Sequence, residues 1–174
     1  MQTVEMQART GLPNAMVVTL RDLEAGDVGW LVAQHGELYA RAEGFDESFG
    51  PLVAGILETY QRERDPACER AWIAVEDGQR LGSIFCVRQD TETAKLRLFL
   101  LTPAARGKGL GLRLLQACMG YARETGYRRM VLWTHESHKA ACALYARNGW
   151  RLVESNPVHS FGVDLVEQTW EVDL

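Results

Sequence analysis

The sequence predicts a single domain of mixed α/β fold, in which a mostly antiparallel sheet is flanked by helices. Two features of the chain lead to this prediction. Three apolar, strand-like segments joined by short turns lie in the middle of the chain, and helical periodicity then alternates with short apolar strands. A chain of 174 residues is long enough to bury a substantial core as one domain.

The N-terminal part of the chain changes character at residue 16. Residues 1–15 have little periodicity, so we expect a flexible leader before a domain of residues 16–174. Residues 16–20 are predicted to form a strand, and residues 26–44 and 52–64 to form helices. The second helix should end at Asp65-Pro66, because the residue before a proline disfavours helical backbone angles.

A meander of strands follows these helices. Residues 71–75 and 81–88 are predicted to pair as a hairpin, because the dipeptide Asp77-Gly78 between them favours a tight turn. Residues 94–101 form the third strand of the meander. This strand leads directly into the glycine-rich hexad Arg106-Gly107-Lys108-Gly109-Leu110-Gly111.

The second half of the chain returns to the sheet through helices. We expect a helix over residues 109–125 and then a strand over residues 130–134, parallel to the strand of residues 94–101 because a crossover helix joins the two. The remaining predicted elements are a helix over 139–147, antiparallel strands over 150–154 and 168–173, and a loop over 157–164.

The hexad has the features of a diphosphate cradle. A glycine-rich turn between a strand and a helix aims free backbone N–H groups at an anion, and glycine lets the anion approach the chain closely. Arg106 and Lys108 add positive charge. A dinucleotide site would need a glycine where Leu112 stands, and a P-loop would need Gly-Lys-Ser/Thr, so both are disfavoured.

Charge, hydropathy and cysteine pattern disfavour several classes of protein. The net charge of -4 argues against a general nucleic-acid surface, which needs a basic face. The longest apolar runs are shorter than a membrane span, and the N-terminus lacks a secretory pattern. We therefore expect a cytoplasmic protein that neither enters a membrane nor binds nucleic acid directly. The four cysteines form no CxxC pair, so we expect free thiols and no structural metal.

Taken together, these segments resemble the GCN5-related N-acetyltransferase (GNAT) superfamily. The hexad matches its Arg/Gln-x-x-Gly-x-Gly/Ala motif, and residues 143–150 are similar to its A-x-x-L-Y-x-x-x-G-F signature. The resemblance implies a GNAT fold, whose sheet splays between its fourth and fifth strands. More narrowly, four segments resemble the acetyltransferase half of bacterial MarR–acetyltransferase fusion proteins: residues 35–39, 94–98, 132–134 and 159–162. No preceding segment is long enough for the winged-helix half, so we do not expect DNA binding.

The resemblance implies acetyl-CoA as the acyl donor. Arg106 would cap the turn or pair with phosphate, and His138 falls where many members carry an asparagine that contacts the cofactor. The pyrophosphate would be held mainly by backbone N–H groups of Gly107, Lys108, Gly109, Leu110 and Gly111. The pantetheine would pair with the backbone of Phe99, Leu100 and Leu101, and an N–H near Leu100 would polarise the thioester carbonyl.

The implied reaction is direct transfer of the acetyl group to a primary amine in a ternary complex. Tyr145 matches the family tyrosine that acts as general acid on the leaving thiolate. The general base stays open, because Trp133 occupies the position of one common glutamate. His135 and Glu136, at the end of the same strand, and His159 in the predicted loop are the candidates.

The acceptor is a small-molecule or peptide amine that the sequence does not identify. Glu43 could bind its positive charge, and a pocket could be walled by Tyr39, Phe45, Trp133, His159 and Phe161. A second hypothesis is a non-catalytic acyl-CoA-binding sensor or regulatory domain, which the missing glutamate favours. A homodimer also stays open.

Overall fold

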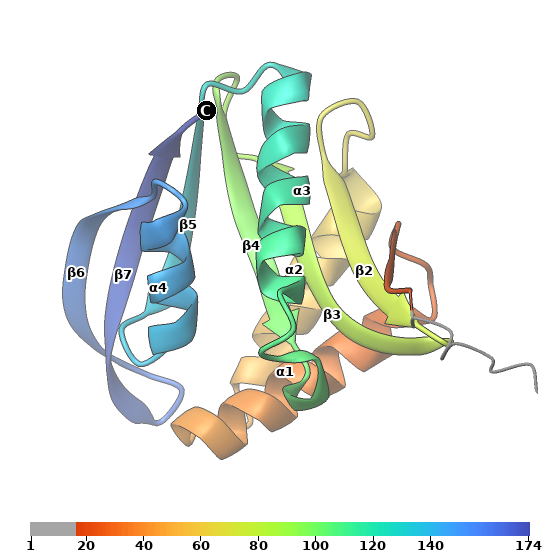
Figure 1. The fold of residues 1–174 in the computed structure, drawn as a ribbon. Helices are drawn as coiled ribbons and strands as arrows, with labels where there is room; N and C mark the ends of the chain where they lie inside the picture. The colour runs from red at the N-terminus through yellow and green to blue at the C-terminus, as the bar shows by residue number, and fades with distance from the viewer. Residues whose placement is uncertain (1–16) are drawn as a thin grey trace, which may run out of the picture.

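The computed structural model describes residues 17–174, so the predicted leader of residues 1–15 lies outside the described residues. Figure 1 shows a sheet with helices on both faces. The strands are β1 (Thr19–Arg21), β2 (Arg70–Glu76), β3 (Gln79–Arg88), β4 (Thr93–Leu101), β5 (Arg129–His135), β6 (Arg151–Ser160) and β7 (Val163–Asp173). The helices are α1 (Asp27–Glu43), α2 (Phe49–Glu63), α3 (Leu110–Thr125) and α4 (Lys139–Arg147), with a 3-10 turn, η1 (Pro103–Ala105).

The seven strands form one sheet in the order β1-β2-β3-β4-β5-β7-β6. The predicted meander is confirmed, since β2, β3 and β4 pair antiparallel in sequence. Asp77 and Gly78 have φ angles of 48° and 77° and form the turn between β2 and β3, as the hairpin signal predicts. The parallel pairing of β4 with β5 is also confirmed.

The predicted loop over residues 157–164 is wrong. β6 continues to Ser160 and β7 begins at Val163, so that only Phe161 and Gly162 remain in the turn. Both have positive φ angles, 53° and 76°, which is the conformation of a tight two-residue hairpin. Pro157 suggests a loop in the sequence, but β6 is an edge strand, where the missing proline N–H costs no ladder hydrogen bond.

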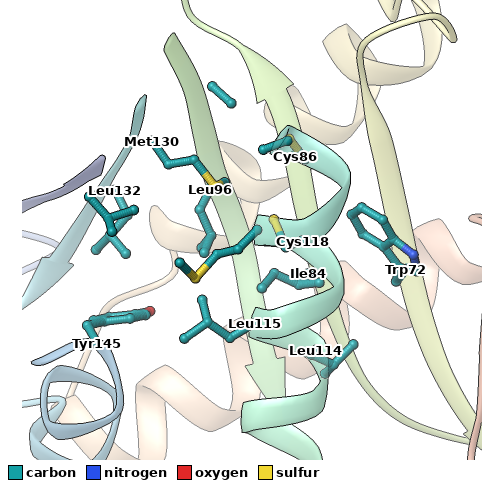
Figure 2. Packing of buried hydrophobic residues seen from close by; sticks show 14 of the residues in the cluster. Trp72, Ile84, Cys86, Leu96, Leu114, Leu115, Cys118, Met130, Leu132 and Tyr145 are labelled. Atoms are coloured by element: carbon teal, nitrogen blue, oxygen red, sulfur yellow. The ribbon is translucent and has the colours of Figure 1, made fainter. Parts of the chain in front are cut away.

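Two hydrophobic clusters cover the two faces of the sheet. One cluster packs α3 and α4 against the face that presents Ala94 and Leu96 of β4 (Figure 2). The other packs α1 and α2 against the opposite face, which presents Phe85 of β3. Because side chains alternate along a strand, Lys95 and Arg97 point to the α1/α2 side. These two cations therefore lie on the face of the sheet opposite α3 and α4.

The sheet splays between β4 and β5, as the resemblance implies. Pairing between these strands is limited to Thr93–Lys95 with Arg129–Val131, whereas β5 pairs with β7 along its whole length. A bulge also interrupts the pairing of β4 with β3: Leu98 has a φ of 46°, and the Ser83 hydroxyl donates to its carbonyl at 2.7 Å. The rest of β4 therefore turns an unpaired edge toward the gap.

Within residues 17–174, no helix combines the length and the apolar character needed to cross a membrane. The four cysteines are all free thiols, and Cys68, Cys86 and Cys118 are buried.

Candidate active site

A cleft of about 480 Å³ lies between the end of β4, the loop before α3, α4 and α1. Its lining includes eight of the site residues named from the sequence. From β4 and the following loop they are Phe99, Leu100, Leu101, Arg106 and Gly107. From α1 and the N-terminus of α4 they are Tyr39, Glu43 and His138. The elements on either side of the splay thus form one concave site.

The glycine-rich loop at one end of the cleft has the geometry of an anion cradle. Gly107 and Gly109 have φ angles of 73° and 77°, and a Cβ on either would meet no atom within 4 Å. Among residues 17–174, the N–H groups of Gly107, Lys108 and Gly109 donate to no acceptor, and the first hydrogen bond of α3 runs from Arg113 to Gly109. Open space and free donors together fit a diphosphate.

The other members of the hexad have different surroundings. Leu110 is buried in the core and anchors the start of α3. A Cβ on Gly111 would come within 3.2 Å of Leu101 Cδ1, so Gly111 allows close helix–strand packing. Of the hexad, Arg106 and Gly107 line the cleft, whereas Lys108, Gly109 and Leu110 line a separate, smaller pocket together with Arg113.

Glu43 and His138 form an ionisable pair among the residues that line the cleft. Glu43 Oε1 lies 3.3 Å from His138 Nε2, and the Thr134 hydroxyl lies 3.3 Å from His138 Nδ1. Burial lowers the pKa of His138; the nearby Glu43 carboxylate opposes this shift, and His135 and Arg106 add to it. The imidazole is therefore mostly neutral at pH 7 and can accept a proton. Thr134, which orients this ring, was not singled out from the sequence.

The candidate bases His135, Glu136 and His159 do not line the cleft. The Nδ1 atom of His135 is buried without a hydrogen-bond partner among residues 17–174, and burial lowers the pKa of the ring. Glu136 is exposed and pairs with Lys139 at 3.7 Å. His159 is exposed near the β6–β7 turn, where its Nδ1 lies 2.7 Å from Asp164.

Three of the predicted pocket aromatics belong to one packed cluster. The ring centroid of Phe45 lies 5.4 Å from that of Tyr39 and 4.9 Å from that of Phe161. Phe49, which the sequence reasoning passed over, lies 4.6 Å from Tyr39. Asp46 N–H donates to the Phe161 carbonyl at 2.9 Å, so this cluster fixes the β6–β7 turn on the α1–α2 connection. Tyr39 alone of the four lines the cleft, and burial raises its pKa to about 12.

Trp133 lies outside this cluster. Its side chain is 68% exposed, and Lys95 Nζ lies 3.5 Å from its ring centroid. Leu132 on β5 belongs to the cluster beneath α3 and α4, so the alternation of side chains directs Trp133 to the opposite, α1/α2 face.

Tyr145 is buried on α4 and does not itself line the cleft, although the preceding residue, Leu144, does. Figure 2 shows it beside Leu132, with its hydroxyl directed toward α3. Within residues 17–174, no hydrogen bond contributes to the pKa of this hydroxyl. Burial raises the pKa of the phenol well above its usual range. The group therefore keeps its proton at neutral pH and is available as a donor.

Comparison with known proteins agrees with this geometry. The profile of the Acetyltransferase (GNAT) family matches residues 28–150. The chain is 30% identical to the uncharacterized N-acetyltransferase YjgM of Escherichia coli over 63% of its own length, and 27% identical to the mycothiol acetyltransferase of Beutenbergia cavernae over 76%. It spans 66% and 43% of the lengths of these two relatives.

A solved structure shows the same fold. The yncA protein of Salmonella typhimurium, determined with its cofactor acetyl-CoA, superimposes with a TM-score of 0.69 at 19% identity, covering 91% of this chain and 94% of that one. The fold, the splayed sheet and the family match together define the class: the chain belongs to the acetyltransferase (GNAT) family.

Proposed function

We propose that the chain transfers an acetyl group from acetyl-CoA to a primary amine by direct reaction in a ternary complex. The observation that carries this proposal is the cleft at the splay, which joins a glycine-rich anion cradle to an unpaired edge of β4. Acetyl-CoA supplies an acyl group activated as a thioester. Gly107 and Gly109 leave room for its diphosphate, and the backbone of Phe99–Leu101 offers hydrogen bonds to its amide-bearing arm.

Tyr145 is the proposed general acid. A departing thiolate needs a proton, since the free thiol has a pKa of roughly 8.5. The buried phenol retains its proton, and among residues 17–174 no hydrogen bond contributes to its raised pKa.

We infer that Glu43 and His138, rather than the three bases suggested by the sequence, deprotonate the acceptor. Both line the cleft, and the His138 ring is mostly neutral at pH 7. The Glu43 carboxylate would hold the ammonium form of the acceptor, and His138 would take its proton before attack. His138 lines the same cleft as Phe99–Leu101, so it would also contact the donor there, as the resemblance implies.

A second candidate function is a non-catalytic acyl-CoA sensor. It is favoured by Trp133, which occupies the β5 position where many family members carry a glutamate. A regulatory role would also suit the resemblance to the MarR–acetyltransferase fusions, in which the acetyltransferase half accompanies a DNA-binding half.

Calorimetry with acetyl-CoA, followed by thiol release across a panel of primary amines, separates the two functions. The enzyme proposal expects binding, thiol release with at least one amine, and a product heavier by one acetyl group in mass spectrometry. Binding without release on any amine would support the sensor. Failure to bind acetyl-CoA would refute both.

A further inference from the structure

Two cations on β4 stand together without a counter-charge. Lys95 and Arg97 both point to the α1/α2 face and are partly buried. Among residues 17–174, neither forms an ion pair or a side-chain hydrogen bond, and no carboxylate acts on the pKa of either group. Burial, with repulsion from Arg97 second, lowers the pKa of Lys95 to about 8. Burial also lowers the pKa of Arg97.

This arrangement differs from that of the charged groups at Asp27 and Arg151, which have partners of opposite charge. The buried Asp27 carboxylate is held by Arg21 and Arg80 at 2.7 Å each. Arg151, on the edge strand β6, pairs with Asp173 at 3.1 Å. Two neighbouring, half-buried cations without an anion are costly, and ionisable groups with strongly perturbed pKa values cluster at functional sites.

The position of the pair points to the acceptor. Lys95 belongs to the last residue pair that joins β4 to β5, and the splay opens immediately beyond it. Arg97 precedes the bulge at Leu98 and lies three residues before Leu100, roughly 10 Å along an extended strand. Trp133, whose ring is in contact with Lys95 Nζ at 3.5 Å, stands on the facing strand. The three side chains thus border the gap on the face opposite α3.

We propose that Lys95 and Arg97 bind an anionic group of the acceptor, so that the substrate class is a small amine that also carries a carboxylate or a phosphate. This inference rests on the proposed function. The anion would lie between the two cations beside Trp133, and the amine would extend through the splay toward Glu43. The distance along β4 suits a compact molecule in which a few bonds separate the amine from the anion.

The test uses binding to the CoA-loaded protein, so that it does not depend on turnover. Two matched pairs of probes are titrated by calorimetry: N-acetylphenylalanine against N-acetylphenylalaninamide, and O-phosphoethanolamine against ethanolamine. Because charge-assisted hydrogen bonds are strong, we expect at least one anionic probe to bind about tenfold to a hundredfold more tightly than its neutral partner. The pair that shows the preference identifies carboxylate or phosphate.

Variants assign the preference to these side chains. Lys95→Gln and Arg97→Gln should each reduce the ratio of anionic to neutral affinity by about tenfold, whereas Arg97→Lys should keep part of it. Arg151→Gln, which removes a paired surface cation, is the matched control and should leave the ratio unchanged.

Equal affinity for anionic and neutral probes, survival of the preference in both Gln variants, or failure of all four probes to bind at millimolar concentration would overturn the inference. An anionic preference in a protein that acetylates no amine would instead count against the proposed function alone.

Discussion

Replacing Gly109 with alanine tests the anion cradle most directly. Gly109 is the N-cap residue immediately before α3, with a φ of 77°, and its Cβ position is open. At the far end of the same helix, Gly126 has a φ of 99° and an equally open Cβ position. The two glycines are therefore matched in backbone conformation and in space, and differ in that only Gly109 lies in the proposed phosphate site.

The expected magnitudes follow from this match. Alanine in left-handed conformation costs roughly 1–2 kcal/mol at either position, which lowers Tm by about 2–8 °C in a domain of this size. At Gly109, the new methyl group also holds the phosphate away from the free N–H groups of the loop. Losing one charge-assisted hydrogen bond costs about 1.5–3 kcal/mol, which corresponds to a roughly ten- to hundredfold weaker Kd for acetyl-CoA.

Thermal unfolding and calorimetry with acetyl-CoA measure the two effects separately. We expect both variants to unfold at similar, lower temperatures, and only Gly109→Ala to lose affinity. If Gly109→Ala binds acetyl-CoA as tightly as Gly126→Ala does, the loop is an ordinary strand–helix turn and the cradle is refuted.

Three further substitutions test other parts of the molecule. Tyr145→Phe should lower kcat about 10²-fold or more with little change in the acetyl-CoA Kd, because a general acid acts on the reaction and not on cofactor binding. Tyr121→Phe is the control variant. Equal effects of Tyr145→Phe on kcat and Kd would exclude the acid role. Glu43→Gln should raise the KM for the acceptor and leave acetyl-CoA affinity intact, which initial rates at varied amine would show. Asp27→Asn should destabilise the fold by about 2–4 kcal/mol in urea at pH 7, less than for a fully buried pair because both arginines are partly exposed. Burial would raise the pKa of Asp27, but hydrogen bonds from Arg21 and Arg80 outweigh it and lower that pKa, so the difference should persist above about pH 4 and shrink at lower pH.

The elements that the sequence predicts well are those with local signals. Asp77-Gly78 specifies the turn between β2 and β3 by itself, because both residues tolerate positive φ angles. The glycines of the hexad predict a tight turn for the same reason, and Gly107 and Gly109 do have positive φ angles. The parallel pairing of β4 with β5 follows from the single helix between them, because a crossover of that length returns in the same direction.

What the sequence does not reveal depends on contacts between distant segments. From the sequence, Phe161 is predicted to lie in a loop. Only the structure shows that the turn that carries it packs on Phe45. The pairing of His138 with Glu43 joins α4 to the end of α1, and no local pattern predicts it. For Lys95 and Arg97 the sequence does contain a pattern, because they alternate with the buried Ala94 and Leu96 along β4. That alternation shows a shared face, whereas the absence of a counter-charge is visible only in three dimensions.

Lys95→Met should make the protein more stable while it weakens anion binding. The fold lowers the pKa of Lys95 to about 8, so folding opposes the charged form at neutral pH. Removing the charge should raise the free energy of unfolding at pH 7 by about 1–2 kcal/mol, after a discount for partial exposure and for the lost contact with Trp133.

The sign of this effect gives a pH test. As pH rises from about 8 toward 10.4, the wild-type Lys95 loses its proton more readily in the folded state than in the unfolded chain. The wild type therefore regains stability over this range, and the advantage of the methionine variant should disappear in urea titrations. A lower stability of Lys95→Met at pH 7 would mean that Lys95 already has a stabilising partner in the free protein. The proposed role of Lys95 in binding the anion of a substrate would then lose its support. That role expects a charge that destabilises the free protein and is kept because function requires it.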